Sequence, residues 1–108
     1  MSLVAGVVLD ALADPTRRAV FELVAEQPSS VSGIALRLPV SRPAVSQHLR
    51  VLREAQLVGV TVSGRQHIYA LDSRGLAAGR AYFEQFWTGA LAAFAQAADA
   101  AAEQGSRT

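Results

Sequence analysis

The chain has 108 residues, enough for one domain but few for burying a large core alone. Hydrophobic residues make up 51% of it, so we expect part of the apolar surface to meet a second subunit. There is no cysteine, which excludes disulfides, thiolate zinc sites and cysteine redox chemistry within this chain. The net charge is only +1, but arginines cluster in the central third while the acids lie mostly towards the ends, so the small net charge can hide a basic face.

The first predicted helix, residues 3–13, is apolar on nearly every side. It carries more apolar side chains than one small domain needs, so we expect it to be buried against a partner subunit; an ordinary core helix is the alternative. The start of the chain has no basic segment, and Asp10 interrupts its apolar run. We therefore expect a cytoplasmic protein that has neither a signal peptide nor a transmembrane segment.

The second predicted helix begins at an Asp-Pro pair, with Asp14 as its N-cap and Pro15 at its first helical position. It ends within residues 26–30, which contain proline and serines. We interpret Arg17 and Arg18 as solvated surface arginines, with contact to phosphate as the alternative.

A short third helix is predicted over residues 33–38, with Ser32 as its cap. A tight turn over residues 39–41 then leads into the fourth helix. Because two helices joined by so short a turn must cross steeply, residues 32–55 are predicted to form a helix-turn-helix.

The fourth helix, residues 41–55, is the segment around which the chain is organised. Ser41 is its predicted N-cap, and Val45, Leu49 and Leu52 form a narrow apolar stripe at helical spacing. Off that stripe lie guanidinium, hydroxyl and amide groups, the types that contact base edges and phosphates. An ordinary amphipathic helix with a solvated polar face is the alternative. The residues of this helix predicted to contact DNA are Ser41, Arg42, Pro43, Ser46, Gln47 and Arg50.

After the fourth helix the pattern changes from a helical to a strand period. Residues 57–62 are rich in β-branched side chains, and residues 66–71 alternate between apolar and polar. Gly64 between them can take the positive φ that a tight hairpin requires. Residues 57–71 are therefore predicted to form a wing, with Arg65 at its tip contacting a minor groove or a phosphate. An exposed loop arginine without a role is the alternative.

The last predicted helix is capped by Ser73 and runs to about residue 103. Apolar side chains recur along it every seven residues, close to the seam of a coiled coil. We interpret this stripe as a dimer interface shared with the first helix, so residues 1–13 and 73–104 are the predicted dimerisation helices. The residues assigned to that interface are Val4, Val8, Phe83, Trp87 and Phe94.

These elements predict one winged helix-turn-helix domain over residues 1–108, mainly α with a small β-hairpin wing. Residues 9–71, well over half of the chain, resemble the ArsR-type family of bacterial winged-helix repressors. The similarity is carried by residues 9–18, by residues 41–55 with the run VSQHLRVLRE, and by Leu57, Val58, Gly64 and Arg65. The Phe86-Trp87 pair is similar to the metal-independent autorepressor branch of that family.

The resemblance implies a homodimeric repressor that binds a palindromic operator on double-stranded DNA. It places Arg42, Pro43, Ser46 and Gln47 at base-reading positions. His48 matches a polar position of the motif, and we interpret it as a helix-packing or phosphate-facing histidine rather than a switch.

The chain departs from the metal-sensing members of the family. The thiol sensors carry cysteines near the third helix, where this chain has serines and valine. The other common metal site uses histidines and carboxylates on the last helix, which here has Glu84 and Asp99 but no histidine. We therefore predict no metal site, no metal response and no cofactor. Gly33 stands where an acidic residue is usual, and Gln56 stands where glycine usually ends the recognition helix.

Two other classes of function are alternatives to a DNA-binding regulator. A winged-helix module that binds protein would expose an apolar face on residues 41–55, whereas this face is arginine-bearing and polar. An enzyme is disfavoured, because the sequence has no glycine-rich phosphate loop and no metal or nucleophile constellation.

Overall fold

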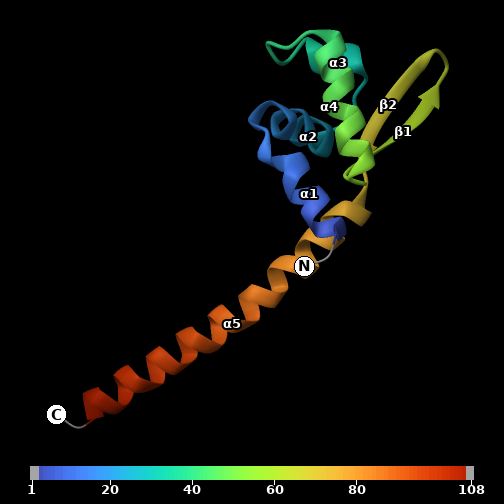
Figure 1. Cartoon of the computed structure of the whole chain (residues 1–108). Coiled ribbons are helices and arrows are strands. Elements are labelled where there is room, and N and C mark those ends of the chain that lie inside the picture. Colours follow the sequence, from blue (N-terminus) through green and yellow to red (C-terminus); the bar gives the residue numbers. More distant parts are fainter. Residues whose placement is uncertain (1–2, 107–108) are drawn as a thin grey trace.

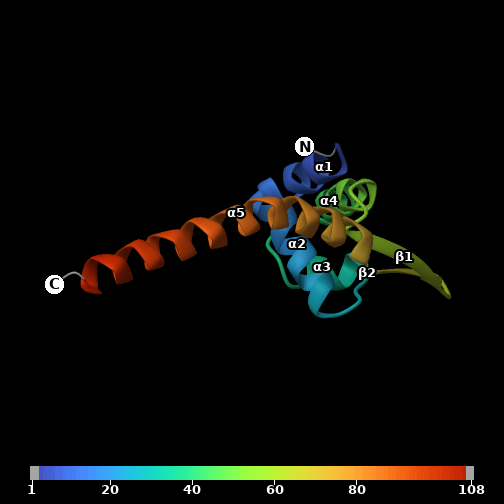
Figure 2. The same ribbon diagram turned by 90° about the horizontal axis from the view of Figure 1, so that it is seen from below.

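The computed structural model describes residues 3–106, which form five helices and one two-stranded antiparallel sheet. The elements are α1 (Leu3–Ala13), α2 (Pro15–Glu26), α3 (Val31–Ala35), α4 (Arg42–Glu54), β1 (Val58–Ser63), β2 (Gln66–Leu71) and α5 (Ser73–Ser106). The first four helices and the hairpin form a body, and α5 leaves it as a single arm, so the molecule measures 72 × 27 × 21 Å (Figures 1 and 2). The predicted mainly α fold with a hairpin wing is confirmed.

The hydrophobic core lies between α1, α2, α3, α4 and the base of the hairpin. Val45, Leu49 and Leu52 of the predicted stripe are all fully buried in it. Burying a side chain of this size stabilises the fold by about 1.5–3 kcal/mol, so the stripe fixes α4 on the body and leaves its other side to solvent. The largest fully buried side chains are Val20, Val24, Ile34, Val45, Leu49, Leu52, Leu57 and Val58.

The junction of α1 and α2 is closed by side chains that hydrogen-bond to the backbone. The Asp14 carboxylate accepts from the backbone N–H of Arg17 at 2.8 Å, and Pro15 stands in the first helical turn, as predicted. The guanidinium of Arg17 donates to the carbonyls of Ala11 and Asp10, at 2.6 and 3.0 Å. Describing Arg17 as a solvated arginine was therefore wrong, because its donors satisfy carbonyls left open at the end of α1.

The third helix starts and ends earlier than predicted. The hydroxyl of Ser30, not that of Ser32, accepts from the backbone N–H of Gly33 at 3.1 Å, so α3 covers Val31–Ala35 rather than residues 33–38. The following residues form a turn. Pro39 disfavours helical backbone at Leu38, the residue before it, which argues against a helix that continues through residue 38.

The hairpin pairs β1 with β2 in the register Ser63↔Gln66 to Val58↔Leu71. Gly64 has a φ of 61°, which confirms the predicted role of glycine in the two-residue turn. At the base of the hairpin, the backbone of Tyr69 exchanges two hydrogen bonds with Ser29, at 2.8 and 2.9 Å. The wing is thus fastened to the segment between α2 and α3.

The start of α5 is packed directly on the end of α4. Gln56, just beyond α4, has a φ of 58°, the left-handed conformation that glycine usually takes at such a helix end. The backbone N–H of Gly75 donates to the carbonyl of Gln56 at 2.8 Å. A Cβ at Gly75 would lie 2.6 Å from the carbonyl oxygen of Ala55, so this close approach requires glycine.

The cap of α5 is Asp72 rather than the predicted Ser73. Its carboxylate accepts from the backbone N–H of Arg74 at 3.0 Å, and Ser73 is already helical. The same carboxylate accepts from the Arg74 guanidinium, at 2.7 Å for the closest pair. These hydrogen bonds lower the pKa of the Asp72 carboxyl below its usual range, and those from the Arg74 side chain contribute most.

The first helix packs along the beginning of α5. Val8 is 3% exposed and belongs to the core, so its assignment to a dimer interface was wrong: this chain's own helices already cover it. A Cβ at Gly79 of α5 would lie 3.5 Å from Cγ1 of Val8, which is ordinary contact distance. Across residues 3–106, none of the helices combines the length and the apolar character needed to cross a membrane.

Candidate nucleic-acid interface

The exposed side of α4 carries the side chains predicted to contact DNA. The Ser41 hydroxyl accepts from the backbone N–H of Ala44 at 3.3 Å, which confirms the predicted N-cap. Beyond this cap, Arg42, Pro43, Ser46, Gln47 and Arg50 are all exposed. Because the buried stripe turns one side of α4 to the core, the residues on the opposite side face solvent.

The wing places Arg65 at the same end of the molecule. Figure 1 shows the N-terminal end of α4 and the tip of the hairpin both lying away from α5. Arg65 is exposed in the two-residue turn, and so are its neighbours over residues 61–67. The structure therefore brings six of the predicted residues together on α4 and sets the seventh apart on the wing.

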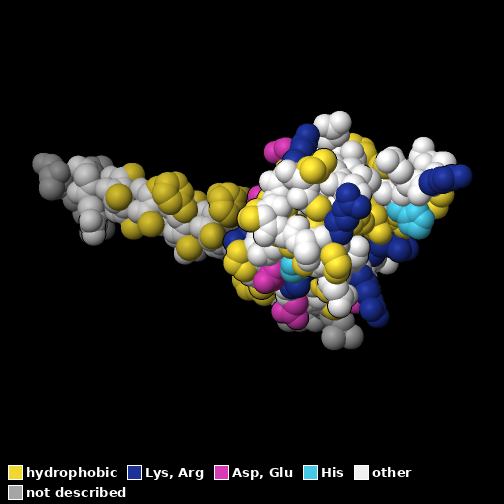
Figure 3. All heavy atoms as spheres, turned by 90° about the horizontal axis from the view of Figure 1, so that it is seen from above, with side chains coloured by type: hydrophobic (Ala, Val, Ile, Leu, Met, Phe, Trp, Pro, Cys, Tyr) yellow, Lys and Arg dark blue, Asp and Glu magenta, His cyan; other side chains and the backbone are white. Residues whose placement is uncertain are grey.

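Arginine side chains project from several points of this end, including the tip of the hairpin, as dark blue atoms in Figure 3 show. The side chains of Arg42 and Arg65 make no hydrogen bond or ion pair with residues 3–106, so their guanidinium groups are free to bind a ligand. Arg50 differs, because its Nε lies 3.5 Å from Oε1 of Glu54. Free guanidinium groups of this kind suit phosphate oxygens and guanine edges.

His48 lies at the border between the stripe and the exposed side of α4. Its side chain is 21% exposed, and its Nδ1 is 4.0 Å from Oδ2 of Asp14. Asp14 also caps α2, so His48 connects the recognition helix to the start of α2. This position agrees with the interpretation of His48 as a helix-packing residue.

Sequence analysis missed two residues near this interface, Arg53 and Tyr69. Together with Ser46, Arg50 and Glu54 they line a hollow between α4 and β2. The three- and four-residue spacing of the two arginines and Ser46 was visible in the sequence and places them on one side of the helix. Tyr69 comes from the wing, and no local pattern could have assigned it to the hollow.

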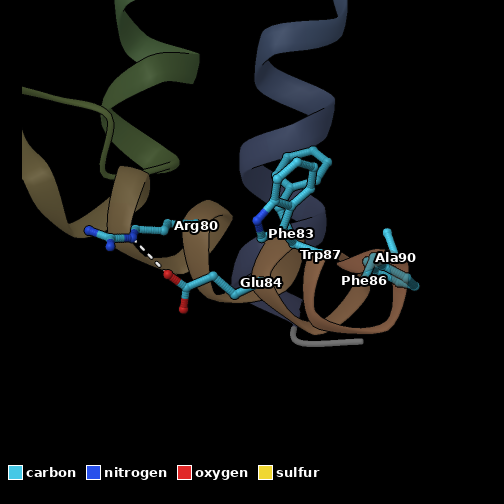
Figure 4. A pocket seen from close by; sticks show the side chains of 6 residues that line it. All are labelled: Arg80, Phe83, Glu84, Phe86, Trp87 and Ala90. Carbon is cyan, nitrogen blue, oxygen red and sulfur yellow. Dashed lines mark hydrogen bonds and ion pairs between the residues drawn. The ribbon is translucent and has the colours of Figure 1, made fainter. Parts of the chain in front are cut away.

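The arm formed by α5 exposes a second kind of surface, which is apolar. Phe83, Trp87 and Phe94 are 58%, 64% and 74% exposed, and Val4 of α1 is 47% exposed. Figure 4 shows Phe83 and Trp87 projecting from the same stretch of α5 that carries the ion pair in which Arg80 and Glu84 approach to 2.8 Å. Phe86 and Leu91, exposed to 58% and 52%, extend this surface. Leu91 was not assigned to this surface from the sequence, whereas Phe86 widens the seven-residue stripe that was interpreted as the interface.

No metal-binding cluster is formed within residues 3–106, where no three His, Cys, Asp or Glu side chains come together. Glu84, one of the two carboxylates noted on the last helix, is paired with Arg80.

A family model and related proteins of known sequence point to the same protein family. Residues 14–60 match the model of the bacterial regulatory protein, arsR family. The chain is 53% identical to the HTH-type transcriptional regulator Rv2034 of Mycobacterium tuberculosis over 82% of this chain and 83% of that protein. It is 30% identical to the transcriptional repressor SdpR of Bacillus subtilis, over 61% of this chain and 73% of that protein.

Solved structures agree with this result. An ArsR-like transcriptional regulator from Rhodococcus sp. RHA1 is similar with a TM-score of 0.72 and 32% identity, over 86% of this chain and 91% of that one. A homodimeric winged helix-turn-helix DNA-binding domain from Mycobacterium bovis shares the fold, with a TM-score of 0.62, 22% identity and coverage of 80% and 78%.

The chain belongs to the ArsR family. It is a DNA-binding transcriptional regulator with a winged helix-turn-helix, and not an enzyme. The family membership confirms the resemblance deduced from residues 9–71.

Proposed function

We propose that this ArsR-family regulator is a cytoplasmic homodimeric repressor that binds a near-palindromic operator and does not respond to metals. The observation that carries the proposal is the free polar side of α4, where Arg42 and Gln47 are exposed opposite a fully buried stripe. Arg42 has the donors to pair with guanine, and Gln47 has the donor and acceptor to pair with adenine. A relative that is itself named a repressor supports the direction of regulation.

The wing serves as the second point of contact with the duplex. Arg65 at the hairpin tip binds a phosphate or enters the minor groove next to the half-site. Arg65 thus contributes affinity that is largely independent of sequence, while Arg42 and Gln47 contribute specificity.

The homodimer is supported by the exposed aromatic side chains of α5. Phe83, Trp87 and Phe94 lie on one heptad-like surface, and an exposed apolar surface of this extent is typical of a protein interface. The name of the M. bovis neighbour, a homodimeric domain of the same fold, agrees with this assembly.

The experiment is a set of DNA titrations with an operator selected from random duplexes. Arg42→Ala should cost about 1–3 kcal/mol per contact and relax the preference at one position of each half-site. Arg65→Ala should weaken binding to operator and scrambled DNA alike and lower the salt slope by about one unit per phosphate contact. Stoichiometric zinc, copper or nickel should leave the wild-type affinity unchanged.

Two outcomes would contradict the proposal. If Arg42→Ala weakened binding to both DNAs equally, Arg42 would be a backbone contact and not a base-reading residue. If the wild-type chain preferred no duplex over competitor DNA, the exposed side of α4 would belong to a protein-binding module instead.

A further inference from the structure

A hollow of about 490 Å³ lies between α4 and β2 of the wing. Its lining consists of Ser46, Arg50, Arg53, Glu54 and Tyr69. Ser46, Arg50 and Arg53 follow one another at four- and three-residue spacing, along one side of the helix. The hollow therefore opens beside the part of α4 that is proposed to face DNA.

The two arginines of the hollow differ in what they contact. Arg50 lies 3.5 Å from the carboxylate of Glu54, so its charge is partly balanced within the chain. The side chain of Arg53 is exposed and makes no hydrogen bond or ion pair with residues 3–106. The uncompensated positive charge of the hollow is therefore that of Arg53.

Tyr69 forms a fixed opposite wall. Its backbone is hydrogen-bonded to Ser29 at 2.8 and 2.9 Å, and its side chain packs against the hydrophobic core. Its hydroxyl makes no hydrogen bond with residues 3–106 and is not buried, so it can donate to a ligand. A guanidinium and a hydroxyl held on facing elements are suitable donors for the oxygens of a phosphate.

We propose that this hollow binds one phosphate of the DNA backbone in each half-site, through the guanidinium of Arg53 and the hydroxyl of Tyr69. The inference rests on the proposed DNA-binding function and identifies the contact that ties the recognition helix to the wing. Because Arg53 belongs to α4 and Tyr69 to β2, one phosphate bound between them fixes both elements on the duplex. Glu54 opposes this attraction by holding Arg50.

The test uses the full chain and the selected operator duplex, with single phosphates replaced one at a time by neutral methylphosphonates. The affinity of the wild type should fall when one particular phosphate of each half-site is replaced. Arg53→Gln and Tyr69→Phe should each bind the unmodified duplex more weakly, about tenfold for Arg53→Gln. Each variant should also lose less affinity than the wild type when that phosphate is neutralised, because one of its two partners is already absent. Arg53→Gln should also lower the slope of log K against log salt by about 0.9 per subunit. Glu54→Gln, which frees Arg50, should raise affinity for operator and scrambled DNA.

The control is Gln85→Glu, which changes the charge by the same amount on an exposed position of α5 and should leave the methylphosphonate pattern unchanged. If Arg53→Gln keeps the wild-type affinity and salt slope while Arg65→Ala weakens binding, the phosphate site is refuted and the DNA-binding function stands. If Arg53→Gln weakens binding but loses as much affinity as the wild type when that phosphate is neutralised, the phosphate is bound elsewhere and the site is also refuted. Absence of DNA binding by the wild type would instead refute the proposed function.

Discussion

Gln56 has a strained backbone conformation, and the packing of α5 on the end of α4 holds it there. Its φ of 58° is that of a left-handed residue, and its carbonyl is held by the N–H of Gly75. An L-residue with a Cβ pays about 1 kcal/mol or more for this conformation, whereas glycine adopts it freely. The sequence already indicated an unusual cap here, because glutamine replaces the expected glycine.

We expect Gln56→Gly to raise the free energy of unfolding by about 1 kcal/mol, because it relieves that strain. Urea unfolding followed by circular dichroism would measure the change. Gln56→Ala is the matched control: it keeps the Cβ and should bring no comparable gain. Equal stabilisation by both variants would show that the side chain, and not φ, is responsible.

Among the contacts between elements, the close packing of α4 against α5 requires that Gly75 has no side chain. A Cβ at Gly75 would meet the carbonyl oxygens of Ala55 and Gln56, at 2.6 and 2.7 Å. Both contacts are with backbone, which cannot rotate away as a side chain can. The end of the recognition helix and the start of the long arm must separate before any larger residue fits.

Gly75→Ala should therefore destabilise the chain by about 1–3 kcal/mol, the usual cost of overpacking. Gly89 on the same helix is the control, because nothing lies within 4 Å of a Cβ built there. Gly89→Ala should stabilise by about 0.5–1 kcal/mol through helix propensity alone. Thermal and urea unfolding of both variants would test the contrast, and loss of stability in both would contradict the role assigned to Gly75.

How well the sequence predicted each element depended on whether its signals were local. The start of α4 was predicted to the residue, because a capping serine and an apolar stripe agree there. The start of α3 was missed because Ser30 and Ser32 are equally good caps, and only the folded chain shows which one receives the N–H of Gly33. Arg17 and Tyr69 could not be assigned, because their partners depend on how separate elements pack.

The candidate site was predicted in the same uneven way. The exposed side of α4 could be predicted from helical periodicity, because identifying the buried stripe of a helix also identifies the side opposite to it. The ion pair of Arg50 with Glu54 also has i,i+4 spacing, yet the sequence could not show that Arg53 beside it remains unpaired. Val8 was misassigned because an apolar helix looks the same whether its own chain or a partner covers it.

At the scale of the whole molecule, α5 is longer than a single subunit requires. Its beginning packs on α1, while Trp87 and Phe94 on the projecting arm are 64% and 74% exposed. We expect Trp87→Glu and Phe94→Glu to yield monomers that keep the secondary structure of the wild type, since neither side chain supports the core of one chain. Gln85→Glu, an exposed charge change outside the heptad-like stripe, should remain dimeric. Light scattering would test this, and a monomeric wild type at micromolar concentration would contradict the proposed dimer.

The assembled dimer should determine how far apart the two half-sites lie. Each subunit presents one α4, and α4 is joined to α5 through Gly75, so the proposed dimer holds its two recognition helices at a set separation. Two such helices contact one face of a duplex when the half-site centres lie about one helical turn apart, roughly 34–36 Å.

We expect insertion of roughly 5 base pairs, about half a turn, at the centre of the operator to reduce affinity to that for a single half-site, because the second half-site then faces away. Anisotropy titrations of the native, expanded and single half-site duplexes would measure this. Arg65→Ala is the control: it should bind every duplex more weakly and keep the same dependence on spacing, since the wing contacts the backbone and not the partner subunit. Equal affinity for the native and expanded duplexes would show that the two recognition helices are not held at a fixed distance.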